Sequence, residues 1–274
     1  GVNIKIMTHL QPQTTTTMNR ITKLFNEKEK DVLSIYYTAG FPMLESTLEI
    51  AQHIEEGGAD MIEIGIPFSD PVADGPTIQE SNKQALDNGM TLKLLFEQLS
   101  SLREQVNIPV ILMGYINPVL QFGFEDFCKK CEECGVDGLI FPDLPISVYE
   151  NEYKAICEQY GLKNTFLITP QTSEQRIRQI DENSDGFIYM VSSASTTGAK
   201  TQVESEQESY FQRIKDMQLK SPTLVGFGIS NHETFKAASK NSRGAIIGSA
   251  FINVLSQNAD LKNDIKNFIN QVKG

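Results

Sequence analysis

A glutamate interrupts an otherwise apolar stretch of the chain, MIEIGI at residues 61–66. The β-branched residues predict a buried strand, in which Glu63 points to one face and Ile62 and Ile64 to the other. A carboxyl group inside a sheet loses part of its hydration, which raises its pKa and makes it a general acid near neutral pH. We therefore predict that Glu63 is catalytic, with a buried structural acid as the alternative.

The loop after this strand, FSDPVADGP at residues 68–76, carries two further acids among rigid and turn-forming residues. Asp74 is the second candidate for the chemistry, and Asp70 lies between the two. Both acids also have an ordinary explanation. Asp70 precedes a proline, as in an Asx turn, and Asp74 could cap a helix that begins at Pro76. The residues alone leave these explanations open.

Three glycine-bearing turns follow the last three predicted strands: TTG at 196–198, GFGIS at 226–230 and GSA at 248–250. Backbone N–H groups and helix N-termini bind phosphate in such turns, because no side chain blocks the approach. Each turn alone is weak evidence, since connections between helices and strands need glycine anyway. Together, at the ends of late strands, the turns favour a phosphate site.

Short β-branched runs alternate with amphipathic helical stretches along the chain, as in α/β proteins with a parallel sheet. This pattern in 274 residues predicts a single (β/α)8 TIM barrel with extra short helices. A doubly wound open sheet is the alternative, but TAGFP stands at 38–42 where its Gly-rich dinucleotide turn would be. The predicted strands are 32–38, 61–66, 110–113, 138–141, 165–168, 186–191, 223–226 and 245–247.

We expect the barrel domain to span residues 18–274. Residues 1–17 end in four threonines and have no sustained periodicity. We interpret them as an N-terminal extension or a cloning remnant without ordered structure.

The overall charge restricts the possible partners. With 35 acidic residues against 24 lysines and arginines, the net charge is -11, which disfavours nucleic acid and anionic membranes. Apolar runs are too short to cross a bilayer, and the N-terminus lacks the pattern of a signal peptide. We therefore expect a cytoplasmic protein.

The cysteines and histidines could suggest a metal site. Cys128 and Cys131 fall on the stripe of a predicted buried helix, and we interpret them, with Cys134 and Cys157, as core residues. The three histidines are scattered and complete no ligand pattern. We expect no metal.

Residues 63–79, EIGIPFSDPVADGPTIQ, closely resemble the signature of the tryptophan synthase α subunit family. The resemblance covers the chain from about Met18 to its end. It implies a TIM-barrel lyase that cleaves indole-3-glycerol phosphate to indole and glyceraldehyde 3-phosphate, the α reaction of L-tryptophan biosynthesis. The further matching segments, in family order, are LMGY at 112–115, PDLP at 142–145, TTG at 196–198, GFGIS at 226–230 and GS at 248–249.

The resemblance implies a role for each site residue. Glu63 would protonate indole C3 and take the proton of the adjacent glycerol hydroxyl. Asp74 would stabilise the positive charge that then develops on the ring nitrogen. Tyr189 would help to position Glu63. Tyr36 and Thr197 would line the substrate pocket, and Gly198, Gly228, Gly248 and Ser249 would hold the phosphate.

The resemblance further implies that this chain has no cofactor. Pyridoxal phosphate is expected only in a β subunit, which would receive indole through a tunnel in an αββα tetramer, with Asp70 facing that partner. Three other functions stay open: another phosphate-binding barrel such as an isomerase or epimerase, a barrel kept as an allosteric partner of the β subunit, and a free-standing indole-producing lyase.

Overall fold

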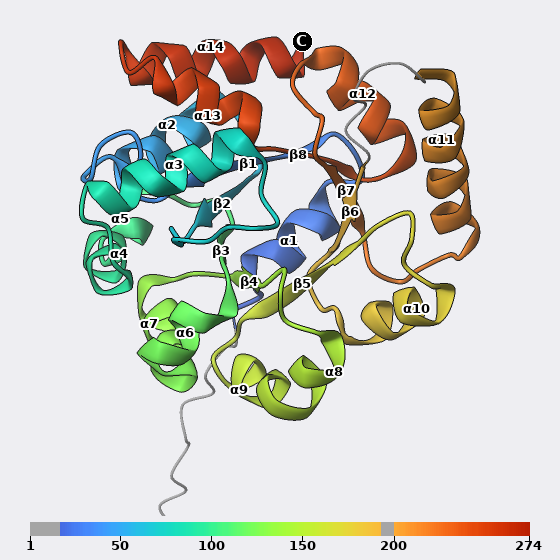
Figure 1. Ribbon diagram of the computed structural model, residues 1–274, viewed down its shortest axis with the longest axis horizontal. Helices are drawn as coiled ribbons and strands as arrows, with labels where there is room; N and C mark the ends of the chain where they lie inside the picture. The colour runs from blue at the N-terminus through green and yellow to red at the C-terminus, as the bar shows by residue number, and fades with distance from the viewer. Residues whose placement is uncertain (1–16, 193–199) are drawn as a thin grey trace, which may run out of the picture.

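The computed structural model describes residues 17–192 and 200–274. Its parallel strands follow one another in sequence order around a closed barrel, and β8 pairs with β1 (Figure 1). The predicted TIM barrel is therefore confirmed. The strands are β1 (Val32–Thr38), β2 (Met61–Gly65), β3 (Val110–Met113), β4 (Gly138–Ile140), β5 (Lys163–Ile168), β6 (Ile188–Val191), β7 (Thr223–Gly226) and β8 (Gly244–Ile247).

Helices surround the barrel, and several of them are short, as predicted. No helix in the described part of the chain is long and apolar enough to cross a membrane. The predicted N-terminal extension, apart from Thr17, lies outside the described residues. The helices are α1 (Arg20–Glu27), α2 (Thr47–Gly57), α3 (Pro76–Asp87), α4 (Leu92–Leu99), α5 (Leu102–Gln105), α6 (Ile116–Phe122), α7 (Phe124–Cys134), α8 (Ile146–Val148), the π-helical turn η1 (Tyr149–Tyr153), α9 (Lys154–Gln159), α10 (Glu174–Asn183), α11 (Lys200–Asp216), α12 (His232–Asn241), α13 (Ser249–Ser256) and α14 (Leu261–Lys273).

The strand register decides which side chains enter the barrel. Glu63 of β2 is paired with Tyr36 of β1 and with Ile111 of β3. Paired residues on neighbouring strands point to the same face, so these three side chains share the barrel interior. Ser34 lies two residues before Tyr36 on β1 and therefore faces inward as well.

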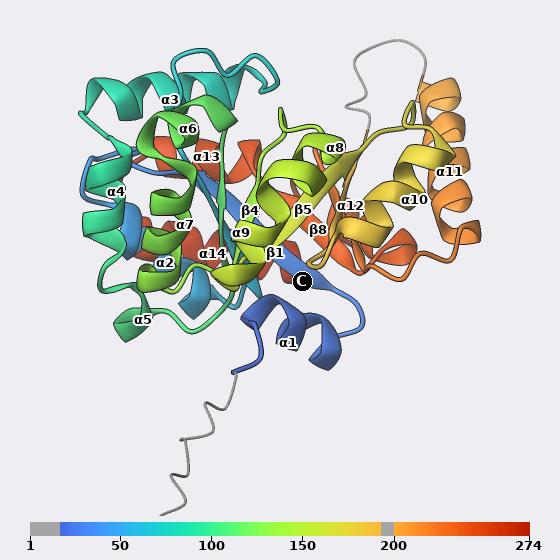
Figure 2. The same ribbon diagram turned by 90° about the horizontal axis from the view of Figure 1, so that it is seen from below.

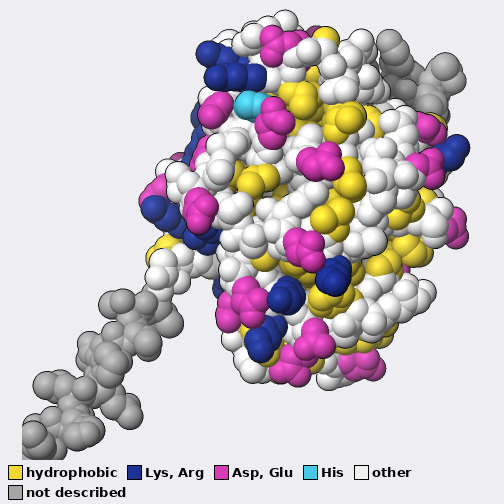
Figure 3. All heavy atoms as spheres, turned by 90° about the vertical axis from the view of Figure 1, so that its left-hand side faces the viewer, with side chains coloured by type: hydrophobic (Ala, Val, Ile, Leu, Met, Phe, Trp, Pro, Cys, Tyr) yellow, Lys and Arg dark blue, Asp and Glu magenta, His cyan; other side chains and the backbone are white. Residues whose placement is uncertain are grey.

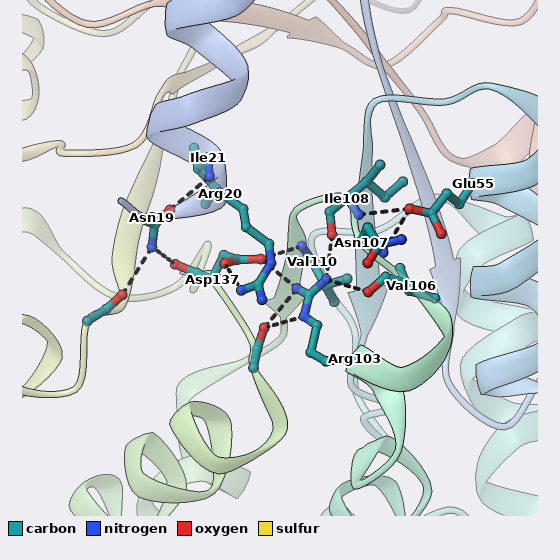
Figure 4. A network of polar contacts seen from close by, with 12 residues as sticks. Asn19, Arg20, Ile21, Glu55, Arg103, Val106, Asn107, Ile108, Val110 and Asp137 are labelled. Atoms are coloured by element: carbon teal, nitrogen blue, oxygen red, sulfur yellow. Dashed lines mark hydrogen bonds and ion pairs between the residues drawn. The ribbon is translucent and has the colours of Figure 1, made fainter. Parts of the chain in front are cut away.

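Helix α1 closes the barrel at the end where the strands begin, opposite α3 (Figure 2). The Asn19 side chain accepts a hydrogen bond from the Ile21 N–H and donates one to the Asp137 carbonyl at 3.0 Å. The Asp137 carboxylate, just before β4, forms ion pairs with Arg20 at 3.1 Å and Arg103 at 2.7 Å (Figure 4). This network fixes the floor of the barrel and leaves the carboxyl ends of the strands for a site.

The four cysteines lie in the packed core, as predicted from the helical stripe. Cys128, Cys131 and Cys134 are buried on α7, and Cys157 is buried on α9. Burial raises the pKa of the Cys131 thiol well above its ordinary value, which keeps it protonated. These residues therefore act as small apolar side chains.

Candidate active site

Glu63 is fully buried in the barrel interior, as its place on an apolar strand predicted. One carboxyl oxygen, Oε2, accepts a hydrogen bond of 2.5 Å from the Ser34 hydroxyl, whereas Oε1 has no hydrogen-bond partner. Burial raises the pKa of Glu63 to about 7, although the Ser34 hydrogen bond opposes the rise by stabilising the carboxylate. A carboxyl group in this state can both give and take a proton near neutral pH.

Two tyrosines lie near this carboxyl group, one on the neighbouring strand β1 and one on β6 across the barrel. Tyr36 of β1 and Tyr189 of β6 are each less than a tenth exposed. Burial raises the pKa of Tyr189, and the negative charge of Glu63 raises it further, so the phenol stays neutral. Each ring lies over a glycine of a neighbouring strand: a Cβ atom on Gly65 would collide with Tyr36, and one on Gly226 with Tyr189.

Asp74 lies in the loop between β2 and α3 and points toward Tyr115, which lies two residues after the end of β3. The Tyr115 hydroxyl donates a hydrogen bond of 3.1 Å to Asp74 Oδ2 and accepts one from the Ala73 N–H. Burial raises the pKa of Asp74, and the Tyr115 hydrogen bond lowers it in part. The alternative role of Asp74 as a helix cap is wrong, because Gly75 is the N-cap of α3 and no side chain caps that helix.

Asp70 is separate from this pair. Its side chain is exposed at the tip of the same loop, and its carbonyl accepts a hydrogen bond from the Val72 N–H. Val72 is 74% exposed, although it is a large apolar residue. This part of the loop therefore points to solvent rather than into the barrel.

A cavity opens at the carboxyl ends of the strands and brings most of the predicted site residues together. Gly248 and Ser249 line it where α13 begins, and Gly228 lines it in the loop after β7. The free N–H groups and the dipole of α13 favour an anion at this end of the cavity. The remaining lining residues are Tyr36, Asp74, Ile78, Met113, Tyr189, Phe227, Ile229, Ser230, Ile246 and Ala250.

Two predicted residues in the described part of the chain do not line the cavity: Glu63 is buried beside it, and Asp70 is exposed on the β2–α3 loop. Thr197 and Gly198 lie outside the described residues. Ser34 and Tyr115, which bind the two acids, were not predicted as site residues. A hydroxyl on a buried strand, facing the same way as Glu63, is the signal that could have revealed Ser34.

Within residues 17–192 and 200–274, no group of three or more His, Cys, Asp or Glu side chains is placed to hold a metal ion. The polar groups of the cavity are two phenols, one carboxylate and the backbone and hydroxyls of the glycine-bearing turns. They suit a ligand with an apolar ring at one end and an anion at the other.

Comparison with known proteins agrees with this geometry. The family described as tryptophan synthase alpha chain matches residues 22–273. The tryptophan synthase alpha chain of Flavobacterium johnsoniae is 59% identical over 256 residues, which cover 93% of this chain and 100% of the relative. That of Bacteroides thetaiotaomicron is 56% identical over 243 residues, covering 89% and 95%.

Solved structures give the same result. The alpha subunit from Legionella pneumophila superposes with a TM-score of 0.85 at 32% identity, covering 94% of this chain and 98% of that one. A chain of tryptophan synthase from M. tuberculosis, in an aminoacrylate-bound form, gives a TM-score of 0.82 at 25% identity, covering 93% and 98%. The sequence match over nearly the whole chain shows that this protein belongs to the tryptophan synthase alpha chain family.

Proposed function

We propose that Glu63 and Asp74 divide the work of the α reaction, in which this lyase of tryptophan biosynthesis cleaves indole-3-glycerol phosphate to indole and glyceraldehyde 3-phosphate. The observation that carries the proposal is a fully buried carboxyl group with a pKa of about 7, beside a cavity that holds a second carboxylate. Groups with such perturbed pKa values in a cleft are typical of acid–base catalysts.

The substrate binds with its phosphate at the start of α13, where Gly228, Gly248 and Ser249 line the cavity. The indole ring then extends toward Asp74, whose carboxylate accepts the ring N–H. Tyr36 and Tyr189 give the ring apolar surface and exclude water. This orientation explains why one end of the cavity is suited to an anion and the other to an apolar ring.

Neutral Glu63 donates its proton to indole C3, and Asp74 stabilises the positive charge that arises on the ring nitrogen. The Glu63 carboxylate next removes the proton of the adjacent glycerol hydroxyl. The carbon–carbon bond breaks, its electron pair returns to the ring, and the hydroxyl carbon becomes the aldehyde. Glu63 ends neutral, as it began.

Glu63 has to turn toward the cavity for these transfers, because it does not line the cavity. The turn breaks one hydrogen bond, that from Ser34 to Oε2, and Oε1 has none to lose. A net hydrogen-bond contribution of about 1 to 3 kcal/mol is small enough for substrate binding to offset.

We propose that the chain needs no cofactor or metal and works in the cytoplasm with a β subunit that holds pyridoxal phosphate, in an αββα tetramer. Large apolar side chains support such a partner surface. Met43, Val72 and Leu120 are exposed by 53%, 74% and 42%, and they follow the adjacent strands β1, β2 and β3. Asp70 lies beside Val72, and hydrophobic side chains also reach the surface among charged ones on the side that carries α4 and α5 (Figure 3).

The direct test is to incubate the purified chain with indole-3-glycerol phosphate and to measure indole. We expect indole and glyceraldehyde 3-phosphate in equal amounts. Absence of both products, with and without a β subunit, would refute the proposal. Gel filtration of the same mixtures tests the partner separately, since the tetramer elutes earlier than either subunit.

A further inference from the structure

Ser34 makes the hydrogen bond that holds the Glu63 carboxyl group. Both residues are fully buried, and the Ser34 hydroxyl lies 2.5 Å from Glu63 Oε2. Within the described part of the chain this is the one hydrogen bond that the carboxyl group accepts, since Oε1 has no partner. A buried acid normally accepts hydrogen bonds from several donors. Glu63 has one donor in the described part of the chain, so its orientation depends on a single serine.

A packing role in the core does not explain why position 34 is a serine. β1 is buried along its whole length, and the neighbours of Ser34 in the strand are Leu33 and Ile35. Burying a hydroxyl group costs free energy unless the group forms a hydrogen bond. An alanine would fill a similar space without that cost, and the hydrogen bond that the hydroxyl makes is to Glu63.

We propose that Ser34 is a positioning residue for the α reaction: its hydroxyl holds Glu63 in the resting enzyme and stabilises the carboxylate form of that group. The inference rests on the proposed role of Glu63. It explains why a polar residue lies on the inner face of β1. The Ser34 hydroxyl stabilises the charged form of Glu63 against the effect of burial, so that both protonation states are accessible near neutral pH.

The other titratable groups near Glu63 do not provide this balance. Tyr36 of β1 and Tyr189 of β6 face it, and burial raises the pKa of both phenols above the physiological range. They therefore stay neutral while Glu63 titrates. The negative charge of Asp74 in the β2–α3 loop raises the pKa of both tyrosines further. On the other side, β3 places the apolar Ile111 beside Glu63. Among the described residues, Ser34 alone donates a hydrogen bond to the Glu63 carboxylate.

Removal of the hydroxyl in Ser34→Ala raises the pKa of Glu63. A hydrogen bond to a charged group corresponds to a shift of about 1 to 2 pH units. Because Glu63 starts the reaction protonated, the high-pH decline of kcat/KM, which reports the free enzyme, moves up by that amount. The decline of kcat moves less, because Glu63 has turned away from Ser34 in the substrate complex. If Ser34 had only a packing role, its replacement would shift neither the decline of kcat/KM nor that of kcat.

The test follows the Glu63 carboxyl carbon by NMR in full-length protein labelled with ¹³C-glutamate, with the signal assigned by its absence in Glu63→Gln. We expect a midpoint near pH 7 in the wild type, one higher by about 1 to 2 pH units in Ser34→Ala, and the wild-type midpoint in Ser34→Thr. Ser184→Ala is the matched control, because it removes another buried hydroxyl, which bonds to the Phe187 carbonyl instead.

Two results would contradict the inference in distinguishable ways. An unchanged NMR midpoint in Ser34→Ala would overturn the role of Ser34 alone, whatever the enzyme catalyses. A shifted midpoint with unchanged pH profiles of kcat/KM would overturn the proposed role of Glu63, and with it the part of Ser34 in the reaction.

Discussion

Replacing Glu63 by glutamine should make the folded protein more stable at neutral pH while removing its activity. The wild-type carboxyl group is fully buried. The resulting loss of hydration disfavours its charged form and raises its pKa from 4.5 to about 7. Between these two pH values the folded protein binds more protons at this site than the unfolded chain does. Wild-type stability therefore falls as the pH rises through this range.

The magnitude follows from the two pKa values. Because Glu63 ionises at lower pH in the unfolded chain than in the folded protein, the free energy of unfolding is reduced by about 1 kcal/mol at pH 5 and by about 3 kcal/mol at pH 7 to 8. Glutamine has nearly the same shape and stays neutral, so Glu63→Gln is free of this pH-dependent cost. The difference in stability between variant and wild type should grow by about 2 kcal/mol from pH 5 to pH 8.

Urea unfolding of both proteins at several pH values between 5 and 8 measures this difference. Glu97→Gln on α4 is the matched control, because that side chain is exposed and its change removes the same charge. We expect the stability difference of the control to be nearly independent of pH. A pH-independent difference for Glu63→Gln as well would refute the argument that burial holds Glu63 close to neutrality.

Three further substitutions test the rest of the site. Asp74→Asn should lower kcat by about 100- to 1,000-fold with little change in the binding of glycerol phosphate, as rate assays and calorimetry can show; an unchanged rate would remove Asp74 from the chemistry. Tyr115→Phe should raise the pKa of Asp74, so the low-pH limb of the kcat profile should move to higher pH. An unchanged low-pH limb would show that Tyr115 does not control the ionisation of Asp74. Gly226→Ala should destabilise the protein by about 1 to 3 kcal/mol in urea unfolding, because the methyl group collides with Tyr189; wild-type stability would show that the ring has room to move.

The barrel could be predicted closely because its strands are buried on both faces and appear as β-branched runs. The errors have local causes. β5 begins at Lys163, earlier than predicted, since Lys163 and Asn164 are polar but still pair with β4. Asp185 makes this possible, because it accepts a hydrogen bond from the Asn164 N–H and lies 3.7 Å from the Lys163 ammonium.

Without the family resemblance, the site could be predicted only where a residue was unusual in its own segment. Glu63 stood out as an acid on an apolar strand. Tyr115 binds Asp74 across 41 positions of the chain, and Ser34 binds Glu63 across 29. The Ser34–Glu63 pair depends on the register of β1 against β2, and the Tyr115–Asp74 pair on how two loops lie together. Local sequence patterns specify neither, so these partners emerged from the fold.

Indole release by Glu63→Gln, measured beside calorimetric binding of glycerol phosphate, tests the central claim most directly. If Glu63 carries the proton to carbon and from oxygen, the variant binds the phosphate ligand as the wild type does and releases no indole. Normal indole release by a variant that lacks this carboxyl group would contradict the claim.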